Sequence, residues 1–310
     1  MKIGIISNHH FSLPSINYLL NNNLIAGFAV PEVVNQNNHN IKMIADTFHL
    51  PIKILQKQNL VENLNGWLSQ IKADVIFVFS FPHKIPEAAL SIPKYGFINF
   101  HPGILPQYRG PDPLFWQIKN GVTETGITAH KIDKNFDSGP IIHIEKEPIN
   151  HHDTYGFLEN KLAVTLLKSV IKILAIINEC DSDTLPFIEQ EKNSSLYYGR
   201  PKETDLIIDW QKQDTLSIQN LVRACNPKYQ GAVTYYKNVP VRFLQASFQQ
   251  ANIFSALPGT VIDTNNCLKI SCVDNKVLSV DIIYVSEGCY TGSAFQSLFN
   301  INVGDRFGWL

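Results

Sequence analysis

The chain has 310 residues, of which 45% are hydrophobic and 17% charged, a balance typical of globular domains. At ~100–200 residues per domain, two domains are expected. The net charge of -1 argues against a polyanionic partner, because proteins that bind nucleic acid usually carry a basic excess or patch. The five cysteines include no Cys-x-x-Cys pair, which is typical of a protein whose thiols stay reduced. The apolar run in "MKIGIISNHH" is too short for a signal peptide or a membrane span. We therefore expect a cytoplasmic protein without a membrane partner.

The first hundred residues alternate between strand and helix patterns. Short apolar runs rich in β-branched residues predict buried strands at residues 2–6, 24–30, 51–55, 74–81 and 95–101. Segments with helical spacing of apolar residues predict helices at residues 12–23, 40–50 and 59–73. This alternation is typical of an α/β domain with a Rossmann-like open, mostly parallel sheet.

The rest of the chain predicts a change of architecture. Two more strands are expected at 125–133 and 140–149, and an apolar helix at Leu162–Ile177 closes the first domain. Short strand-like runs separated by turn signals then predict a small β-rich, barrel-like domain. Accordingly, we expect a first domain over residues 1–184, a polar linker over 185–206 and a C-terminal domain over 207–310.

Polar side chains stand at the end of the fifth expected strand, in "FINFHPGILPQYRG". Asn99 and His101 are two residues apart, so both side chains point to one face near the carboxyl end of a strand, where open α/β sheets bind ligands. Asp137, in the loop "KNFDSGP", joins them if its strands neighbour this one. A carboxylate orients an imidazole and raises its pKa, and an amide can donate to a developing oxyanion. The alternative is that Asn99 and His101 only cap the loop.

Two motifs, "NFHPGILPQYRGPDPLFW" and "TGITAHKIDKNFDSGPII", resemble those of the formyltransferases that use 10-formyltetrahydrofolate. The family pattern combines Asn-x-His, a Ser-x-Leu-Pro-x-Tyr-Arg-Gly loop and an Asp-x-Gly-x-(Ile/Leu) loop about 36 residues past the His. The matching residues are Asn99, His101, Leu105, Pro106, Tyr108, Arg109, Gly110, Asp137 and Gly139. Pro102-Gly103 departs from the residues that many members carry there. "DLIIDW" and "NLVRACNPKYQGAVTYY" more weakly resemble the second domain of methionyl-tRNA and sugar-nucleotide formyltransferases.

The resemblance implies roles for these residues. Asn99 and a protonated His101 would stabilise the oxyanion that forms when an amine attacks the formyl carbon, and Asp137 would hold His101 and help move the proton. The pterin of 10-formyltetrahydrofolate would enter a cleft beside "FSFPHKIP", where Pro82 lacks an N–H donor. Contacts to this donor are expected from Phe81, His83, Lys84, Ile85, Ile104, Leu105, Asp133 and Asn135.

Contacts to the acceptor are expected from His10, Tyr108, Arg109 and Arg200. For Arg109 a structural role in its loop is an equal alternative. For His10, which follows the first strand with His9, substrate binding is the less favoured interpretation, and an exposed histidine pair is favoured over a metal site. No metal site is expected. The sequence "SNHHFS" stands where a dinucleotide-binding chain has its glycine-rich loop, which argues against a dinucleotide cofactor.

Several acceptors fit such a chain. We favour a small-molecule amine, a nucleotide-linked amino sugar first and an amino acid or peptide second. Methionyl-tRNA is the alternative, but relatives acting on it carry a basic insertion after the second strand, whereas residues 31–50 hold one lysine, Lys42. Water as acceptor would make a formyltetrahydrofolate hydrolase, whose regulatory domain precedes the catalytic one, while this chain opens on the first strand. A non-enzymatic binding module ranks last. A homodimer is left open.

Overall fold

The computed structural model describes residues 1–32, 36–180, 184–191, 196–249, 256–265 and 267–308. The chain divides into two compact units. The first comprises Met1–Pro113, Glu124–Pro148 and Glu159–Gly199, and the second comprises Leu114–Thr123, Ile149–Leu158 and Arg200–Leu310. The second unit thus takes two short segments from the first half of the chain. Residues 192–195 of the expected linker, and residue 250, expected to end a strand, lie outside the described residues.

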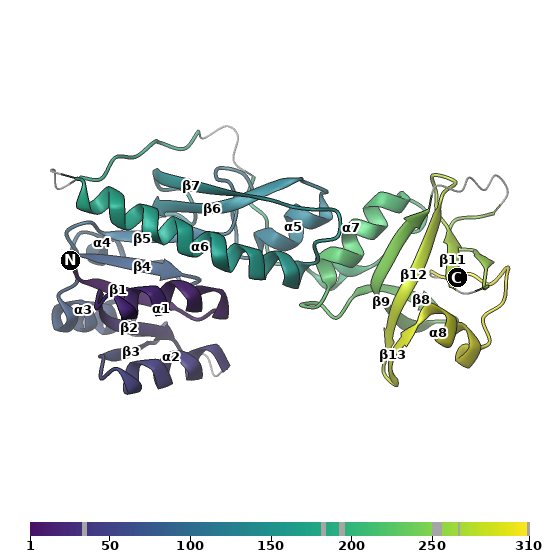
Figure 1. Cartoon of the computed structure of the whole chain (residues 1–310), viewed down its shortest axis with the longest axis horizontal. Coiled ribbons are helices and arrows are strands. Elements are labelled where there is room, and N and C mark those ends of the chain that lie inside the picture. The colour runs from purple at the N-terminus through teal and green to yellow at the C-terminus, as the bar shows by residue number, and fades with distance from the viewer. Residues whose placement is uncertain (33–35, 181–183, 192–195, 250–255, 266, 309–310) are drawn as a thin grey trace. The chain divides into compact units, whose positions relative to one another are not determined.

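The first unit is built on a seven-stranded sheet in the order β3-β2-β1-β4-β5-β6-β7 (Figure 1). The strands are β1 (Ile3–Ser7), β2 (Ile25–Pro31), β3 (Ile52–Leu55), β4 (Val75–Phe79), β5 (Phe97–His101), β6 (Glu124–Lys131) and β7 (Ile141–Pro148). Strands β1 to β5 pair in parallel, whereas β6 is antiparallel to both β5 and β7. The expected Rossmann-like, mostly parallel α/β sheet is therefore confirmed.

Helices cover both faces of this sheet. They are α1 (Leu13–Asn21), α2 (Gln36–Thr47), α3 (Leu60–Ile71), α4 (Glu87–Leu90) and α6 (Tyr155–Asn178). Helices α1 and α6 lie on the face turned toward the viewer in Figure 1. On the other face, Trp67 and Leu64 of α3 pack with Ile76 of β4 in a buried apolar cluster. Gly4 of β1 permits this contact, because a Cβ there would lie 2.6 Å from Ile76 Cδ1.

The strand order positions a ligand site. The parallel strands β1, β4 and β5 all end at one edge of the sheet, and the order reverses between β1 and β4. In open α/β sheets, ligands bind at the carboxyl ends of the strands near such a reversal. Asn99 and His101, at the end of β5, therefore lie where the fold favours a ligand.

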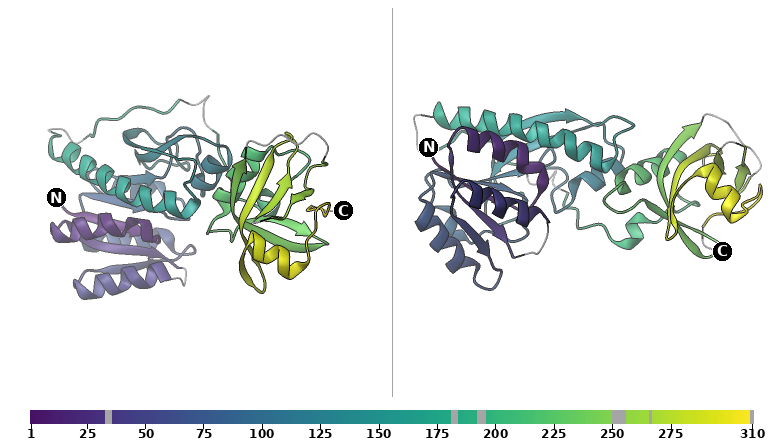
Figure 2. Two further views of the ribbon diagram at one scale, coloured as in Figure 1. Left: turned by 45° about the vertical axis from the view of Figure 1, so that its right-hand side comes forward. Right: turned by 60° about the horizontal axis from the view of Figure 1, so that its bottom comes forward.

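The second unit contains a six-stranded antiparallel sheet, curled into the barrel-like shape that the sequence predicts (Figure 2). Its strands are β8 (Ala232–Tyr236), β9 (Val239–Gln249), β10 (Val261–Asp263), β11 (Leu268–Ser271), β12 (Val277–Val285) and β13 (Gly288–Thr291). Its helices are α5 (Pro113–Lys119), which begins one residue before the unit, α7 (Thr215–Cys225) and α8 (Gly292–Phe299). Trp210 Nε1 donates to Thr234 Oγ1 at 2.9 Å in its core.

Three helices went unpredicted for local reasons. Pro113 opens α5 inside a loop rich in Pro and Gly, although proline suits the first helical position. Thr291 caps α8 by accepting from the Ala294 N–H. The remaining helix, α4, spans four residues. Among the described residues, no helix has the length and apolarity needed to cross a membrane.

Candidate active site

The end of β5 brings the three expected polar side chains together. Asp137 Oδ1 lies 3.4 Å from Asn99 Nδ2 and 3.6 Å from His101 Nδ1. His101 is 3% exposed, and its Nε2 lies 2.9 Å from the Tyr108 carbonyl oxygen, to which it donates. One carboxylate thus faces an amide and an imidazole from the same strand.

A fourth polar side chain, which the sequence analysis missed, completes this cluster. His130 of β6 stands directly opposite Asn99 in the antiparallel register. Its Nε2 lies 3.0 Å from Asn99 Nδ2 and 3.8 Å from Asp137 Oδ1, and the residue is 2% exposed. The sequence did hold a sign of this residue, because Thr128 and His130 are two apart in a predicted strand and therefore share one face. Assigning His130 to the site nevertheless required the register in which β6 pairs with β5.

Burial and charge set the protonation of the cluster. Burial raises the pKa of Asp137, but its polar neighbours, His101 foremost and the Gly110 N–H as well, outweigh it and hold that pKa well below its usual range. Burial lowers the pKa of His101, and nearby Asp137 only partly offsets this. The expected upward effect of the carboxylate on the His101 pKa is therefore present, but it is smaller than the effect of burial.

Glycines let the surrounding loops approach the carboxylate. The Gly110 N–H donates to Asp137 Oδ2 at 3.0 Å. Gly110 has a φ of +119°, and a Cβ there would lie 2.0 Å from the Tyr198 carbonyl oxygen. At Gly139 a Cβ would lie 1.9 Å from the Lys131 carbonyl oxygen. Larger residues would displace the loop that carries Asp137.

Part of the expected linker fastens this loop. Gln190, which is 9% exposed, donates through Nε2 to the carbonyl oxygens of Asp137 at 3.1 Å and Gly139 at 2.7 Å. Its Oε1 accepts from Arg109 Nη2 at 2.5 Å. Ile188 also pairs with Ile141 in an antiparallel bridge. Residues 188–190 therefore form a strap over the Asp137 loop, and composition alone did not indicate it.

A pocket opens beside the cluster. It is lined by Val78, Phe81, His83, Lys84, Ile85, Asn99, His130, Ile132, Asp133, Asn135, Phe136 and Asp137. Six of the eight residues expected to contact the donor are among these. The other two, Ile104 and Leu105, are not among the described residues that line the pocket. Leu105 is 2% exposed and its N–H donates to Thr128 Oγ1, so this residue supports the loop. Five of the twelve lining residues are apolar and seven are polar or charged, and such a mixed lining suits a flat heteroaromatic ring with polar edges.

The expected acceptor residues are not all together. The Tyr108 ring stacks on Tyr198, with centroids 5.1 Å apart, and the guanidinium of Arg109 binds Gln190. Both residues therefore support the site loops. Arg200 is exposed and opens the long segment of the second unit.

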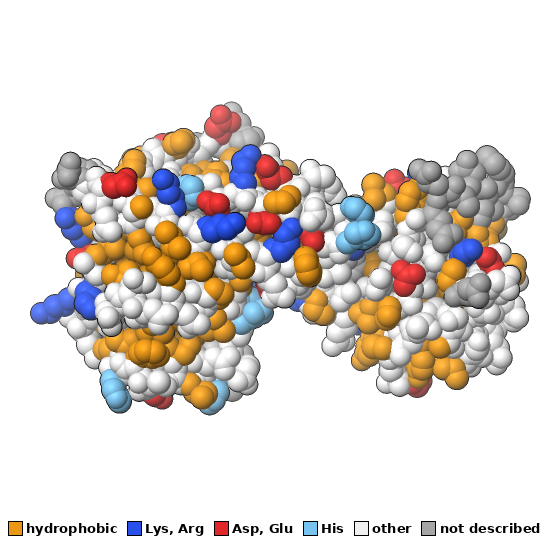
Figure 3. All heavy atoms as spheres, in the orientation of Figure 1, with side chains coloured by type: hydrophobic (Ala, Val, Ile, Leu, Met, Phe, Trp, Pro, Cys, Tyr) orange, Lys and Arg blue, Asp and Glu red, His pale blue; other side chains and the backbone are white. Residues whose placement is uncertain are grey.

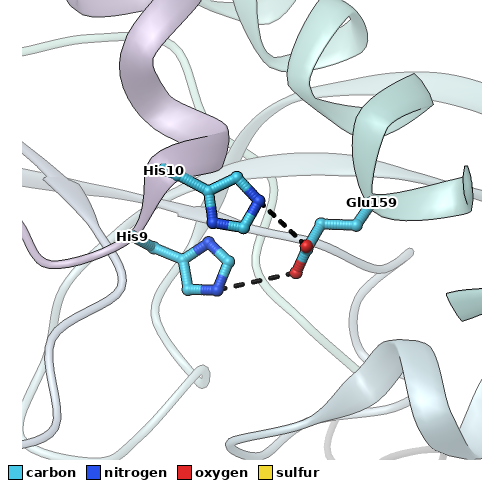
Figure 4. Close-up of side chains that lie close together, drawn as sticks. All are labelled: His9, His10 and Glu159. Carbon is cyan, nitrogen blue, oxygen red and sulfur yellow. Dashed lines mark ion pairs between the residues drawn. The ribbon is translucent and has the colours of Figure 1, made fainter. Parts of the chain in front are cut away.

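His10 belongs to a cluster with His9 and Glu159 (Figure 4). His9 Nε2 lies 3.5 Å from Glu159 Oε1, and His10 Nε2 lies 3.1 Å from Oε2. The Phe11 N–H donates to His9 Nδ1, so the proton of a neutral His9 ring is on Nε2 and faces the carboxylate. This arrangement favours hydrogen bonds to Glu159 over metal coordination through His9.

Comparison with known proteins identifies the family. Residues 28–174 match the formyl transferase family model, and residues 201–288 match the model of the formyl transferase C-terminal domain. The methionyl-tRNA formyltransferase of Clostridium beijerinckii is 32% identical over 230 residues, which cover 74% of this chain and 71% of that relative. The chain belongs to the formyl transferase family. It is therefore a formyltransferase, and the expected enzyme class is confirmed.

Solved structures share the fold of this formyltransferase. One is an N-formyltransferase from Helicobacter canadensis in complex with folinic acid and dTDP-3-aminofucose, with 21% identity and a TM-score of 0.68; the match covers 94% of this chain and all of that one. Another is HypX from Aquifex aeolicus in complex with tetrahydrofolic acid, with 16% identity and a TM-score of 0.63. The match covers 98% of the formyltransferase but only 48% of HypX.

Proposed function

We propose that this formyltransferase moves a formyl group from 10-formyltetrahydrofolate to the primary amine of a small molecule, a nucleotide-linked amino sugar. The observation that carries the proposal is the convergence of Asn99, His101 and Asp137 beside a half-apolar pocket. These groups can bind, polarise and move protons. Together they suit direct attack of an amine on a bound formyl group.

The pocket fits the donor. Phe81 and Ile85 offer apolar contact to a flat ring, and Ile132 adds to this surface. Asp133 holds the neighbouring loop by accepting from the Asn135 N–H at 2.9 Å and from Ser138 Oγ, which leaves its backbone in a fixed position. When bound, the donor supplies a carbonyl carbon that is open to attack by a nitrogen nucleophile. The two solved structures described above contain folinic acid or tetrahydrofolic acid.

Each residue of the polar cluster has a separate role in the transfer. Asn99 donates an N–H to the oxygen that gains negative charge as the new C–N bond forms. Asp137, ionised because its pKa is lowered, takes the proton that the attacking amine loses. Burial lowers the pKa of His101, and its Nδ1 faces Asp137 at 3.6 Å, where it can carry that proton. The proton then leaves with the departing nitrogen.

Charge supports a small acceptor. Residues 200–310 hold ten Lys or Arg and nine Asp or Glu, a net charge of +1. Among these cations, Lys212, Lys269 and Lys276 form ion pairs with Asp209, Asp263 and Asp274. Basic and acidic groups also intermingle on the face that Figure 3 shows. Binding of an RNA backbone depends on many cationic side chains that neutralise phosphates. Here the Lys and Arg side chains are mixed with acidic ones, so few of them gather in one place.

Methionyl-tRNA is the second candidate acceptor. The observation that favours it is the 32% identity with a methionyl-tRNA formyltransferase. The cluster of Asn99, His101 and Asp137 suits formyl transfer to either amine. Only an assay of the acceptors can therefore distinguish a sugar nucleotide from methionyl-tRNA as the substrate.

An acceptor panel tests the proposal. Purified protein is incubated with 10-formyltetrahydrofolate and, separately, with nucleotide-linked amino sugars, amino acids and charged initiator tRNA, and products are followed by mass spectrometry. We expect a sugar nucleotide to gain one carbon and one oxygen. Formylation of none of these amines, with release of free formate instead, would support a hydrolase and contradict the proposal.

A further inference from the structure

The environment of His130 fixes which of its ring nitrogens carries the proton. Nδ1 lies 2.8 Å from the Lys131 carbonyl oxygen, which can only accept. Nδ1 therefore carries the hydrogen, and in the neutral ring Nε2 is left as an acceptor. That acceptor faces Asn99 Nδ2 at 3.0 Å.

Two acceptors together determine the orientation of the Asn99 amide. Nδ2 has two hydrogens, and it lies 3.0 Å from His130 Nε2 and 3.4 Å from Asp137 Oδ1. A flipped amide would place its oxygen against the lone pair of His130 and the carboxylate of Asp137. Both contacts would then be repulsive, so the nitrogen end must face the cluster.

We propose that His130 is a positioning residue that holds the Asn99 amide in its donating orientation. The proposal rests on the function proposed above. The shorter contact, to His130, anchors one N–H. The longer contact, to Asp137 at 3.4 Å, leaves the second N–H available to the oxygen that becomes negative during transfer. In this role His130 acts through Asn99.

Two substitutions of matched chemistry separate the contacts of His130. His130→Gln places an amide oxygen near the position of Nε2 and keeps an acceptor for Asn99, but loses the hydrogen bond to Lys131. His130→Asn places its amide near Nδ1 and keeps the bond to Lys131, but loses the acceptor. We expect His130→Asn to lower kcat by ~10–100-fold, since a 1 Å misplacement costs about 100-fold. His130→Gln should retain most of the activity.

A double-mutant cycle tests whether the effect passes through Asn99. In an Asn99→Ala background, His130→Asn should cost little more, because interacting sites are non-additive. A full additional loss there, or a loss in His130→Gln that equals the loss in His130→Asn, would overturn the proposal and leave His130 a structural residue.

A measurement without donor or acceptor gives an independent readout. The side-chain amide protons of Asn99 should exchange slowly with water in the wild-type protein and in His130→Gln, and faster in His130→Asn, as followed by NMR. Equal exchange in all three contradicts the proposal. Failure of wild-type protein to formylate any amine would instead contradict the proposed function, so the two failures are distinguishable.

Discussion

Replacing Gln190 with methionine removes the strap from the Asp137 loop while keeping the size of the side chain. The variant loses two hydrogen bonds to carbonyl oxygens and one to the Arg109 guanidinium. At about 0.5–1.5 kcal/mol for a neutral bond and about 1.5–3 for a charged one, the loss is about 2.5–6 kcal/mol, toward the low end if Arg109 recovers water. The first unit should then unfold roughly 5–24 °C lower, at about 2–4 °C per kcal/mol for a unit of this size.

The same variant should also slow formyl transfer. Without Gln190, the carbonyl oxygens of Asp137 and Gly139 lose their donors, and the loop relaxes toward water. A shift of about 1 Å in the carboxylate costs about 100-fold in rate. We therefore expect kcat to fall by ~10–100-fold with a smaller change in donor affinity. Thermal unfolding, steady-state kinetics and donor titration measure the three quantities.

A control in the same segment makes the result interpretable. Glu189 is exposed beside Gln190, and Glu189→Gln changes charge without touching the loop. It should match the wild-type protein in melting temperature and rate. If Gln190→Met behaves like this control in both measurements, the strap does not hold the Asp137 loop and the reasoning fails.

Three further predictions concern the same cluster. Asp137→Asn should fold but lower kcat by ~100–10,000-fold, the usual contribution of a positioned acid–base group, and a rate within tenfold of wild type would reduce Asp137 to a loop residue. Because the His101 pKa is lowered from 6.5 on folding, the unfolded chain binds more protons than the folded chain between the two pKa values. The free energy of unfolding should therefore be highest above pH 6.5 and should fall as the pH drops toward the lowered pKa. His101→Gln should flatten that fall in denaturant titrations at several pH values, and an unchanged slope would show that His101 is not responsible. Gly139→Ala should lose more than about 1 kcal/mol of stability and most activity, since its Cβ meets the Lys131 carbonyl, whereas Gly66→Ala, with nothing within 4 Å, should not destabilise.

Local patterns sufficed for much of the fold and for three members of the cluster. Residues Asn99 and His101 share a strand face by simple alternation, and Asp137 follows from a short loop between two predicted strands. The alternating helix and strand segments predicted the mostly parallel sheet, whereas the strand order that brings Asp137 to Asn99 and His101 came only from the structure. The features that were predicted depend on neighbours in sequence, which is why the sequence could predict them.

What the sequence could not predict depends on tertiary contacts. The role of His130 requires the antiparallel register of β6 against β5, which no local pattern specifies. The lowered pKa of His101 reflects its burial, which outweighs the upward effect of the neighbouring carboxylate and which the sequence alone does not reveal. The strap at Gln190 lies in a polar segment that composition marks as a linker. Each miss involves residues that are far apart in the chain but adjacent in space.

A competition for the formyl group tests the central claim most directly. Wild-type protein is given 10-formyltetrahydrofolate with a labelled formyl carbon, together with equal concentrations of a nucleotide-linked amino sugar and charged initiator tRNA, at physiological salt. The account predicts that the label appears on the sugar amine and that Asp137→Asn abolishes most of this incorporation. Label found on methionyl-tRNA, with none on the sugar, would contradict the proposed acceptor.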